Sequence, residues 1–206
     1  MTYKMQKSTK KHINRIVVIF FLILIGIATF FIFRDVKKIE ETSFVYRNID
    51  FKQLRDGNII RYSFPVYINS AQESLTAEIR SNPNDLKNII YDTKVKSILN
   101  KPQIYVTMDK NSTGLAVAAY TELKYFLANP ALWRINTTGA FTEAISTYPV
   151  RTCNDVDTKT GIIQLTQGPQ ETITFTNGCV LLTGPTEEGY IRLADKLNLI
   201  LLNIEP

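Results

Sequence analysis

The stretch "KPQIYVTMDKNSTGLAVAAYTELKYFLANP", residues 101–130, decides the expected fold. Residues 104–107 form a short β-branched and aromatic run that is typical of a strand. Apolar residues then recur at helical spacing from Leu115 to Leu127, which predicts a helix. Asn111, Ser112 or Thr113 can cap the start of this helix, and Asn129-Pro130 should end it.

The segments around this stretch predict further strands. "ALWRINTTG", residues 131–139, favours a strand near Ile135, which completes a β-α-β unit in which Ile104–Thr107 runs parallel to it. Residues 43–69 alternate apolar and polar side chains around Asp56-Gly57-Asn58, a hairpin signal. Residues 161–184 contain two or three more strands, separated by Gly168-Pro169 and Asn177-Gly178.

The last segment, "PTEEGYIRLADKLNLILLNI" at 185–204, predicts a second main helix from Thr186 to about Leu202. Its broad apolar face, with Leu197 near the middle, should pack on the sheet, while Arg192 and Lys196 should face water. The expected fold class is therefore α/β or α+β, a mixed-sheet domain with two main helices.

The N-terminal part contains an uncharged run of 18 residues from Ile16 to Phe33, with basic residues on both sides. A helix of that length spans about 27 Å, which is close to the roughly 30 Å of a bilayer's hydrocarbon core. No small-residue cleavage site follows Phe33, so the run resembles an uncleaved signal anchor more than a removable signal peptide. A buried core helix is the alternative.

This transmembrane helix divides the chain into four parts. We expect a basic cytosolic tail at 1–15, the membrane helix at 16–33, a charged stalk at 34–42 and an extracytoplasmic α/β domain at 43–206. Basic residues are almost balanced on the two sides of the span, so charge alone decides the orientation poorly. The cysteines favour a cytoplasmic N-terminus with the large domain outside.

The net charge of +5 comes entirely from the tail. The first 33 residues contain five Lys or Arg and no acidic residue, whereas the rest of the chain contains 19 basic and 19 acidic residues. A basic tail suits anionic lipid headgroups. The large domain has no basic excess for phosphate contacts, so we expect no nucleic-acid partner.

Cys153 and Cys179 are the two cysteines of the chain, and both follow the predicted span. In an exported domain, two cysteines beside turn residues favour one disulfide. Two reduced, buried thiols are the alternative.

The distribution of titratable residues limits the possible chemistry. The single histidine, His12, lies in the tail, so the domain lacks a histidine base and the usual ligands of zinc. Carboxylate-only mechanisms remain possible, and the candidate carboxylates are scattered along the domain: Asp92, Asp109, Glu122, Glu143 and Asp195. The sequence identifies no catalytic, cofactor-binding or metal-binding set.

Two further motifs have ordinary structural interpretations. "NDVDTKTG", residues 154–161, loosely resembles a calcium loop but lacks its spaced ligands, which favours an Asx-rich turn. Asn111 and Asn136 fit the N-glycosylation pattern, although a chain of this composition contains about two such matches by chance.

Segments at both ends of the domain carry a resemblance to a group of uncharacterised membrane-anchored archaeal proteins. "FVYRNIDFKQL" and "AEIRSNPNDLKNI" resemble the start of their domain, and "VRTCNDV" with "ITFTNGCVLLTGPTEEGYIRLADKLNLILLNI" resembles its end. The resemblance implies a single N-terminal anchor, an exported α/β domain and a cysteine pair, here Cys153 and Cys179. It implies no enzymatic activity and no cofactor.

We expect a membrane-anchored extracytoplasmic module of the cell envelope that binds another envelope protein or its own copies. One alternative is an accessory subunit of a larger membrane complex, whose helix at 16–33 packs on other helices. Another is an extracytoplasmic enzyme that works with carboxylates. Exposed apolar surface would favour binding to proteins, and a cleft with facing carboxylates would favour an enzyme.

Overall fold

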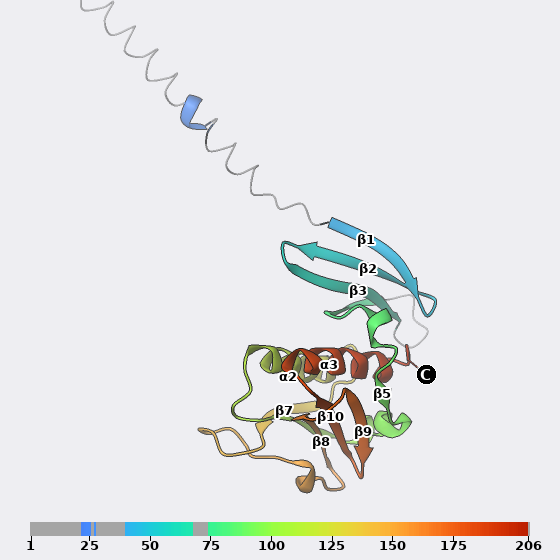
Figure 1. The fold of residues 1–206 in the computed structure, drawn as a ribbon, viewed down its shortest axis with the longest axis vertical. Coiled ribbons are helices and arrows are strands. Elements are labelled where there is room, and N and C mark those ends of the chain that lie inside the picture. Colours follow the sequence, from blue (N-terminus) through green and yellow to red (C-terminus); the bar gives the residue numbers. More distant parts are fainter. Residues whose placement is uncertain (1–21, 26, 28–39, 68–73, 206) are drawn as a thin grey trace, which may run out of the picture. The chain divides into compact units, whose positions relative to one another are not determined.

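The computed structural model describes residues 22–25, 27, 40–67 and 74–205 (Figure 1). The chain divides into two compact units, residues 1–40 with 56–59, and residues 41–55 with 60–206. In the first unit, residues 22–25 and 27 are helical and exposed. Most of the predicted span at 16–33, and all of the predicted tail at 1–15, lie outside the described residues. Among the helices that are described, none is long and apolar enough to cross a membrane.

A four-stranded sheet precedes the α/β part of the chain. Its strands follow in sequence order: β1 (Glu40–Tyr46), β2 (Ile49–Asp56), β3 (Ile59–Tyr67) and β4 (Ser74–Ile79). The turn between β2 and β3 contains Gly57 at φ +61°, which glycine adopts without strain, so the predicted hairpin at 56–58 is confirmed.

Aromatic side chains fill one face of this sheet. The rings of Phe51 and Phe64 stack with centroids 4.6 Å apart, and Phe44 stacks on Phe51 at 5.7 Å. β1 begins at Glu40, so the predicted stalk at 34–42 extends too far. The charges in its last residues belong to an edge strand, where Glu41 pairs with Lys52 of β2 at 2.8 Å.

A six-stranded sheet forms the centre of the α/β part. Its order is β5-β9-β10-β8-β6-β7, and its strands are β5 (Ile90–Tyr91), β6 (Gln103–Met108), β7 (Asn136–Phe141), β8 (Thr160–Gln167), β9 (Thr172–Thr176) and β10 (Cys179–Gly184). β10, β8, β6 and β7 are parallel, while β9 is antiparallel to β10 and β5 is parallel to β9. The mixed α/β class is confirmed.

The predicted β-α-β unit is confirmed. β6 and β7 pair in parallel, with Ile104 opposite Thr137, and α2 (Gly114–Ala128) connects them. α2 starts after Thr113 and ends before Asn129, as the sequence predicts. Within the described residues, three 3-10 helices connect other elements: η1 (Pro83–Leu86), η2 (Thr93–Asn100) and η3 (Cys153–Asp155).

The second main helix, α3 (Glu187–Leu201), lies beside α2, and both cover one face of the six-stranded sheet (Figure 1). Thr186 caps it through a hydrogen bond from the Gly189 amide. α3 contacts α2, β9, β10, η1 and η2, so nearly its whole circumference is covered. Leu197 is fully buried, which confirms its predicted place in the core.

The prediction that Lys196 faces water is wrong. Its side chain is 1% exposed, and its ammonium lies 3.2 Å from the Glu205 carboxylate. The Tyr46 hydroxyl donates a hydrogen bond to the same carboxylate, and the Tyr91 ring centroid lies 5.2 Å from the ammonium. Arg192 is half-buried and pairs with Glu171 at 3.0 Å. The prediction from the apolar pattern of α3 failed because Glu205 and Tyr91 cover the Lys196 side chain.

The predicted disulfide is present. Cys153 in η3 and Cys179 at the start of β10 are bonded, with their Cα atoms 5.4 Å apart. The bond links η3, in the connection that precedes β8, to β10, which pairs with β8. It therefore fastens the loop that precedes β8 to the central sheet.

Candidate functional site

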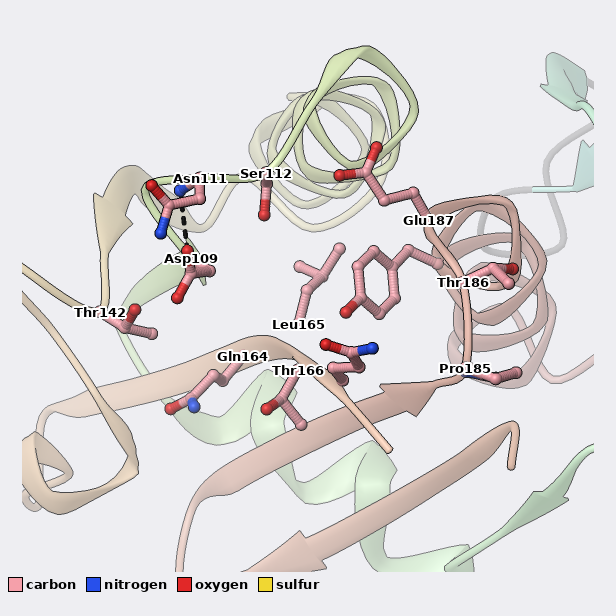
Figure 2. Close-up of a pocket in the computed structure, with 12 residues that line it drawn as sticks. Asp109, Asn111, Ser112, Thr142, Gln164, Leu165, Thr166, Pro185, Thr186 and Glu187 are labelled. Atoms are coloured by element: carbon pink, nitrogen blue, oxygen red, sulfur yellow. Dashed lines mark hydrogen bonds between the residues drawn. The ribbon is translucent and has the colours of Figure 1, made fainter. Parts of the chain in front are cut away.

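A cleft of about 540 Å³ lies at the carboxyl ends of the parallel strands (Figure 2). Its lining comes from four places: the loop after β6, the residue after β7, the end of β8, and the segment from the end of β10 into α3. We call it the switch-point cleft, and its lining residues are Asp109, Asn111, Ser112, Thr142, Gln164, Leu165, Thr166, Gln167, Pro185, Thr186, Glu187 and Tyr190.

The order of the strands explains why a cleft forms here. From β6 the chain passes through α2 to β7 on one side, whereas from β8 it continues to β9 and β10 on the other side. Connections that leave two neighbouring parallel strands in opposite directions open a crevice outside their carboxyl ends. Ligands of open α/β sheets bind at this position more often than elsewhere. The topology therefore selects the switch-point cleft as the candidate site.

The loop after β6 is fixed by Asp109. Its carboxylate accepts a hydrogen bond from the Asn111 amide at 2.7 Å, and its carbonyl accepts one from the Ser112 amide at 3.1 Å (Figure 2). This local turn holds the side chains of Asn111 and Ser112 at the rim of the cleft. Of the three predicted caps, Thr113 occupies the N-cap position of α2, but its side chain makes no capping hydrogen bond to the helix.

Glu187, in the first turn of α3, caps α2. Its Oε1 accepts a hydrogen bond from the Thr113 amide at 2.6 Å, and its Oε2 accepts one from the Thr113 hydroxyl. These bonds, with a further one from the Ala116 amide, lower the pKa of Glu187. Because the first amides of a helix have no partner within it, this carboxylate satisfies groups that would otherwise need water or a ligand.

Tyr190 contributes a buried ring to the cleft and is only 7% exposed. Burial is the main cause that raises the pKa of its hydroxyl, and the charges of Glu187 and Asp109 act in the same direction. The hydroxyl therefore stays neutral and can both donate and accept a hydrogen bond. It forms no hydrogen bond with any residue in the described part of the chain.

The end of β8 supplies neutral polar groups. The Gln164 side chain accepts a hydrogen bond from the Cys153 amide at 3.1 Å, so the disulfide-bonded segment helps to orient it. Thr166 is two residues further along β8 and lies beside the cleft with it (Figure 2). No lysine or arginine is among the residues that line the cleft.

The carboxylates that the sequence singled out do not assemble into one site. Asp109 lines the cleft, whereas Asp92 caps η2 through the Lys94 amide at 2.8 Å. Glu143 pairs with Lys110, and Glu122 pairs with Arg80. These carboxylates therefore hold loops and helix starts in place. In the described ranges, no group of three or more His, Cys, Asp or Glu residues is placed to hold a metal ion.

Asp195 is buried in α3, with 1% of the residue exposed. Its carboxylate accepts hydrogen bonds from the backbone amides of Ser81, at 2.7 Å, and Arg80, at 3.1 Å. Burial raises the pKa of Asp195 to about 7, against the opposite effect of those hydrogen bonds. This group holds the segment after β4 on α3 and does not reach the cleft.

The other two sequence motifs fall in loops. Asp157 accepts hydrogen bonds from the amides of Lys159 and Thr160, both at 2.7 Å, so the Asx-rich turn is confirmed. Asn111 is exposed at the rim of the cleft, and Asn136 is exposed at the first position of β7.

Most of the site lay beyond sequence reasoning. Thr142, Gln164, Thr166 and Glu187 come together because β7, β6, β8 and β10 are parallel neighbours. The available signal was the position of polar residues directly after predicted strands, which indicates a shared edge once the strands are known to be parallel.

Comparisons with known proteins identify no family for this chain. No family model, no curated protein and no solved structure matches this chain.

Proposed function

We propose that this chain is a membrane-anchored, extracytoplasmic binding module of the cell envelope, whose ligand site is the switch-point cleft. The observation that carries the ligand site is that the cleft coincides with the point between the parallel strands β6 and β8 where their connections leave toward opposite sides of the sheet. Its volume of about 540 Å³ falls within the range of small-molecule sites, about 300–1,000 Å³.

The anchoring part of the proposal rests on the sequence. The uncharged run at 16–33 has the length of a membrane helix, and the tail at 1–15 is basic and free of acidic residues. The disulfide between Cys153 and Cys179 fits a domain on the oxidising side of the membrane. These features support an N-terminus in the cytoplasm and a domain outside.

We also propose that the anchored module contacts another envelope protein or its own copies. α2 supports this with exposed apolar side chains, among them Leu115 (46% exposed) and Tyr125 (68% exposed). A photocrosslinking residue at Tyr125, in intact cells, should give a covalent adduct of higher mass. The same residue placed at the exposed Asn154 is the control, and equal adducts at both positions would contradict a specific contact on α2.

A carboxylate-dependent enzyme has less support. Asp109 and Glu187 both line the cleft, but both carboxylate oxygens of Glu187 accept hydrogen bonds from Thr113 at the start of α2. A general acid needs a raised pKa, whereas the pKa of Glu187 is lowered. The role of Glu187 is therefore better described as structural.

The ligand-site proposal is tested by filling the cleft. Thr166→Trp places a large ring among the lining residues, and Thr174→Trp is the matched control on β9 of the same sheet, outside the cleft. The full chain in detergent is screened against neutral, cationic and anionic small polar molecules by melting temperature, because a ligand that binds the folded state raises it. Hits should persist in the control and disappear in Thr166→Trp. The absence of hits, or identical hits in both variants, would contradict the proposal.

The location is tested separately. Protease added to intact cells should digest the domain at 43–206 and leave the tail protected. Cells broken open before digestion show whether the domain is sensitive to the protease at all. A domain that survives in intact cells and is cut in broken cells would overturn the proposed orientation.

A further inference from the structure

The usual anion position of an α/β cleft is already filled in this protein. The N-terminus of a helix that follows a parallel strand attracts phosphate, because its free amides and the helix dipole favour negative charge. At the start of α2 this place is taken by the Glu187 carboxylate, which accepts hydrogen bonds from both the amide and the hydroxyl of Thr113. Asp109 adds a second carboxylate, and no lining residue is basic. An anionic ligand would be repelled.

The groups that remain free in the cleft are neutral. Six polar lining side chains make no hydrogen bond to another described residue: Asn111, Ser112, Thr142, Thr166, Gln167 and Tyr190. Each hydroxyl and amide among them can donate and accept hydrogen bonds. Tyr190 is the most informative member, since the residue is buried while its hydroxyl opens into the cleft, where it has no partner among the described residues.

Metal ions and organic cations fit the cleft less well. A hard cation such as calcium takes about six to eight oxygen ligands, usually with several carboxylates. In the cleft only Asp109 has a carboxylate oxygen to spare, because its Oδ1 is held by the Asn111 amide and Glu187 is fully bonded. An ammonium group is favoured by an aromatic cage, whereas Tyr190 is the one aromatic residue that lines the cleft.

We infer that the switch-point cleft binds a neutral, hydroxyl-rich ligand of the saccharide class. A ring of hydroxyls and amides matches the donors and acceptors of such a ligand, and the single available carboxylate can accept from two neighbouring hydroxyls. The inference rests on the proposed function, because it names the ligand class of the same cleft. Its occupant is either a free sugar or part of a longer neutral glycan.

Calorimetric titration of the full chain tests this inference. The chain is held in a polyoxyethylene detergent, which contains neither sugar nor phosphate. The probes are glucose, mannose, N-acetylglucosamine and their short neutral oligomers, with inorganic phosphate, glucose 6-phosphate, putrescine and calcium chloride as competitors of other classes. At least one neutral saccharide should bind in a saturable manner, and glucose 6-phosphate should bind more weakly than glucose. Tighter binding of the oligomers than of the monosaccharides would assign the site to a glycan chain, and equal binding to a free sugar.

Two tyrosine variants locate the binding. Tyr190→Phe keeps the ring and removes the free hydroxyl, so it should weaken saccharide binding about three- to tenfold, the value of one hydrogen bond. Tyr125→Phe makes the same change on the exposed face of α2 and should leave the affinity unchanged. Equal affinities in the two variants would place the saccharide elsewhere and overturn the inference.

A third variant tests the exclusion of anions. Glu187→Ala exposes the first amides of α2 and should bind inorganic phosphate more tightly than the wild-type chain does. If phosphate or glucose 6-phosphate binds the wild-type cleft better than the neutral sugars, the ligand class is wrong. In that case the ligand site would still be supported if the polar-molecule screen gives hits that disappear in Thr166→Trp. A screen without such hits would overturn the proposed ligand site as well.

Discussion

The ammonium of Lys196 lies 3.2 Å from the carboxylate of Glu205, and both side chains are almost fully buried. Burial lowers the pKa of Lys196, whereas the adjacent Glu205 carboxylate acts in the opposite direction. The pair connects α3 to the end of the chain, and the hydrogen bond from Tyr46 extends it to β1. Removing one partner of a buried ion pair destabilises the folded state, because the charge of the other partner stays buried.

Lys196→Ala should destabilise the protein by about 1.5–3 kcal/mol, because it removes a charged hydrogen bond and leaves the buried Glu205 with Arg47, at 3.4 Å, as its remaining cation. Lys159→Ala is the matched control: Lys159 is exposed, and its replacement should cost less than about 0.5 kcal/mol. Denaturant unfolding of the full chain in detergent, followed by the fluorescence of its single tryptophan, Trp133, measures both. Equal midpoints would contradict the buried pair.

Leu197→Ala should create a cavity in the core between α3 and its neighbours. The residue is fully buried, and truncation of a buried leucine costs about 2–5 kcal/mol. The same unfolding experiment checks the value. Parental stability combined with the loss of a binding partner would show that this face of α3 is an interface.

Reduction of the disulfide should lower the melting temperature. In the chain-entropy model, a loop closed between Cys153 and Cys179 contributes about 3.5 kcal/mol by restricting the unfolded chain. The double variant Cys153→Ser, Cys179→Ser should melt at the temperature of the reduced chain and should not respond to reductant. A parent whose melting is insensitive to reductant would argue against the bond.

Asp195 should make stability depend on pH in an unusual direction. Its folded pKa of about 7 lies above the value of about 3.9 for an unfolded aspartate. The folded state therefore holds the proton more tightly, and this contribution to stability is complete below the unfolded pKa and is lost as the pH rises through about 7.

The comparison of Asp195→Asn with the parent isolates this effect. The asparagine oxygen can still accept from the amides of Arg80 and Ser81 but does not titrate. Between about pH 4 and pH 7, the stability of the parent relative to the variant should fall as the pH rises. A difference that does not change over this range would contradict the raised pKa.

The sequence predicted the fold well where local signals agree with tertiary structure. The strand at 104–107 and the helix that starts after Thr113 follow from periodicity and end signals, and the parallel strand predicted near Ile135 lies at Asn136–Phe141. Lys196 and Asp195 were beyond this reasoning, since Tyr91 and Arg80, which are distant in sequence, contribute to their environments. The cleft was not predicted for a similar reason. The pairing of β6, β8 and β10 cannot be inferred from the sequence of any one segment.

The central claim, that the switch-point cleft is the ligand site, is tested most directly by methyl NMR. The full chain, labelled at leucine and threonine methyl groups, is titrated in turn with each neutral saccharide of the calorimetric experiment in a sugar-free detergent. The account predicts saturable shifts of Leu165, Thr142 and Thr166, which line the cleft, and none at Leu132 or Leu202 in a separate hollow. Shifts confined to Leu132 and Leu202, or no shifts at any concentration, would contradict it.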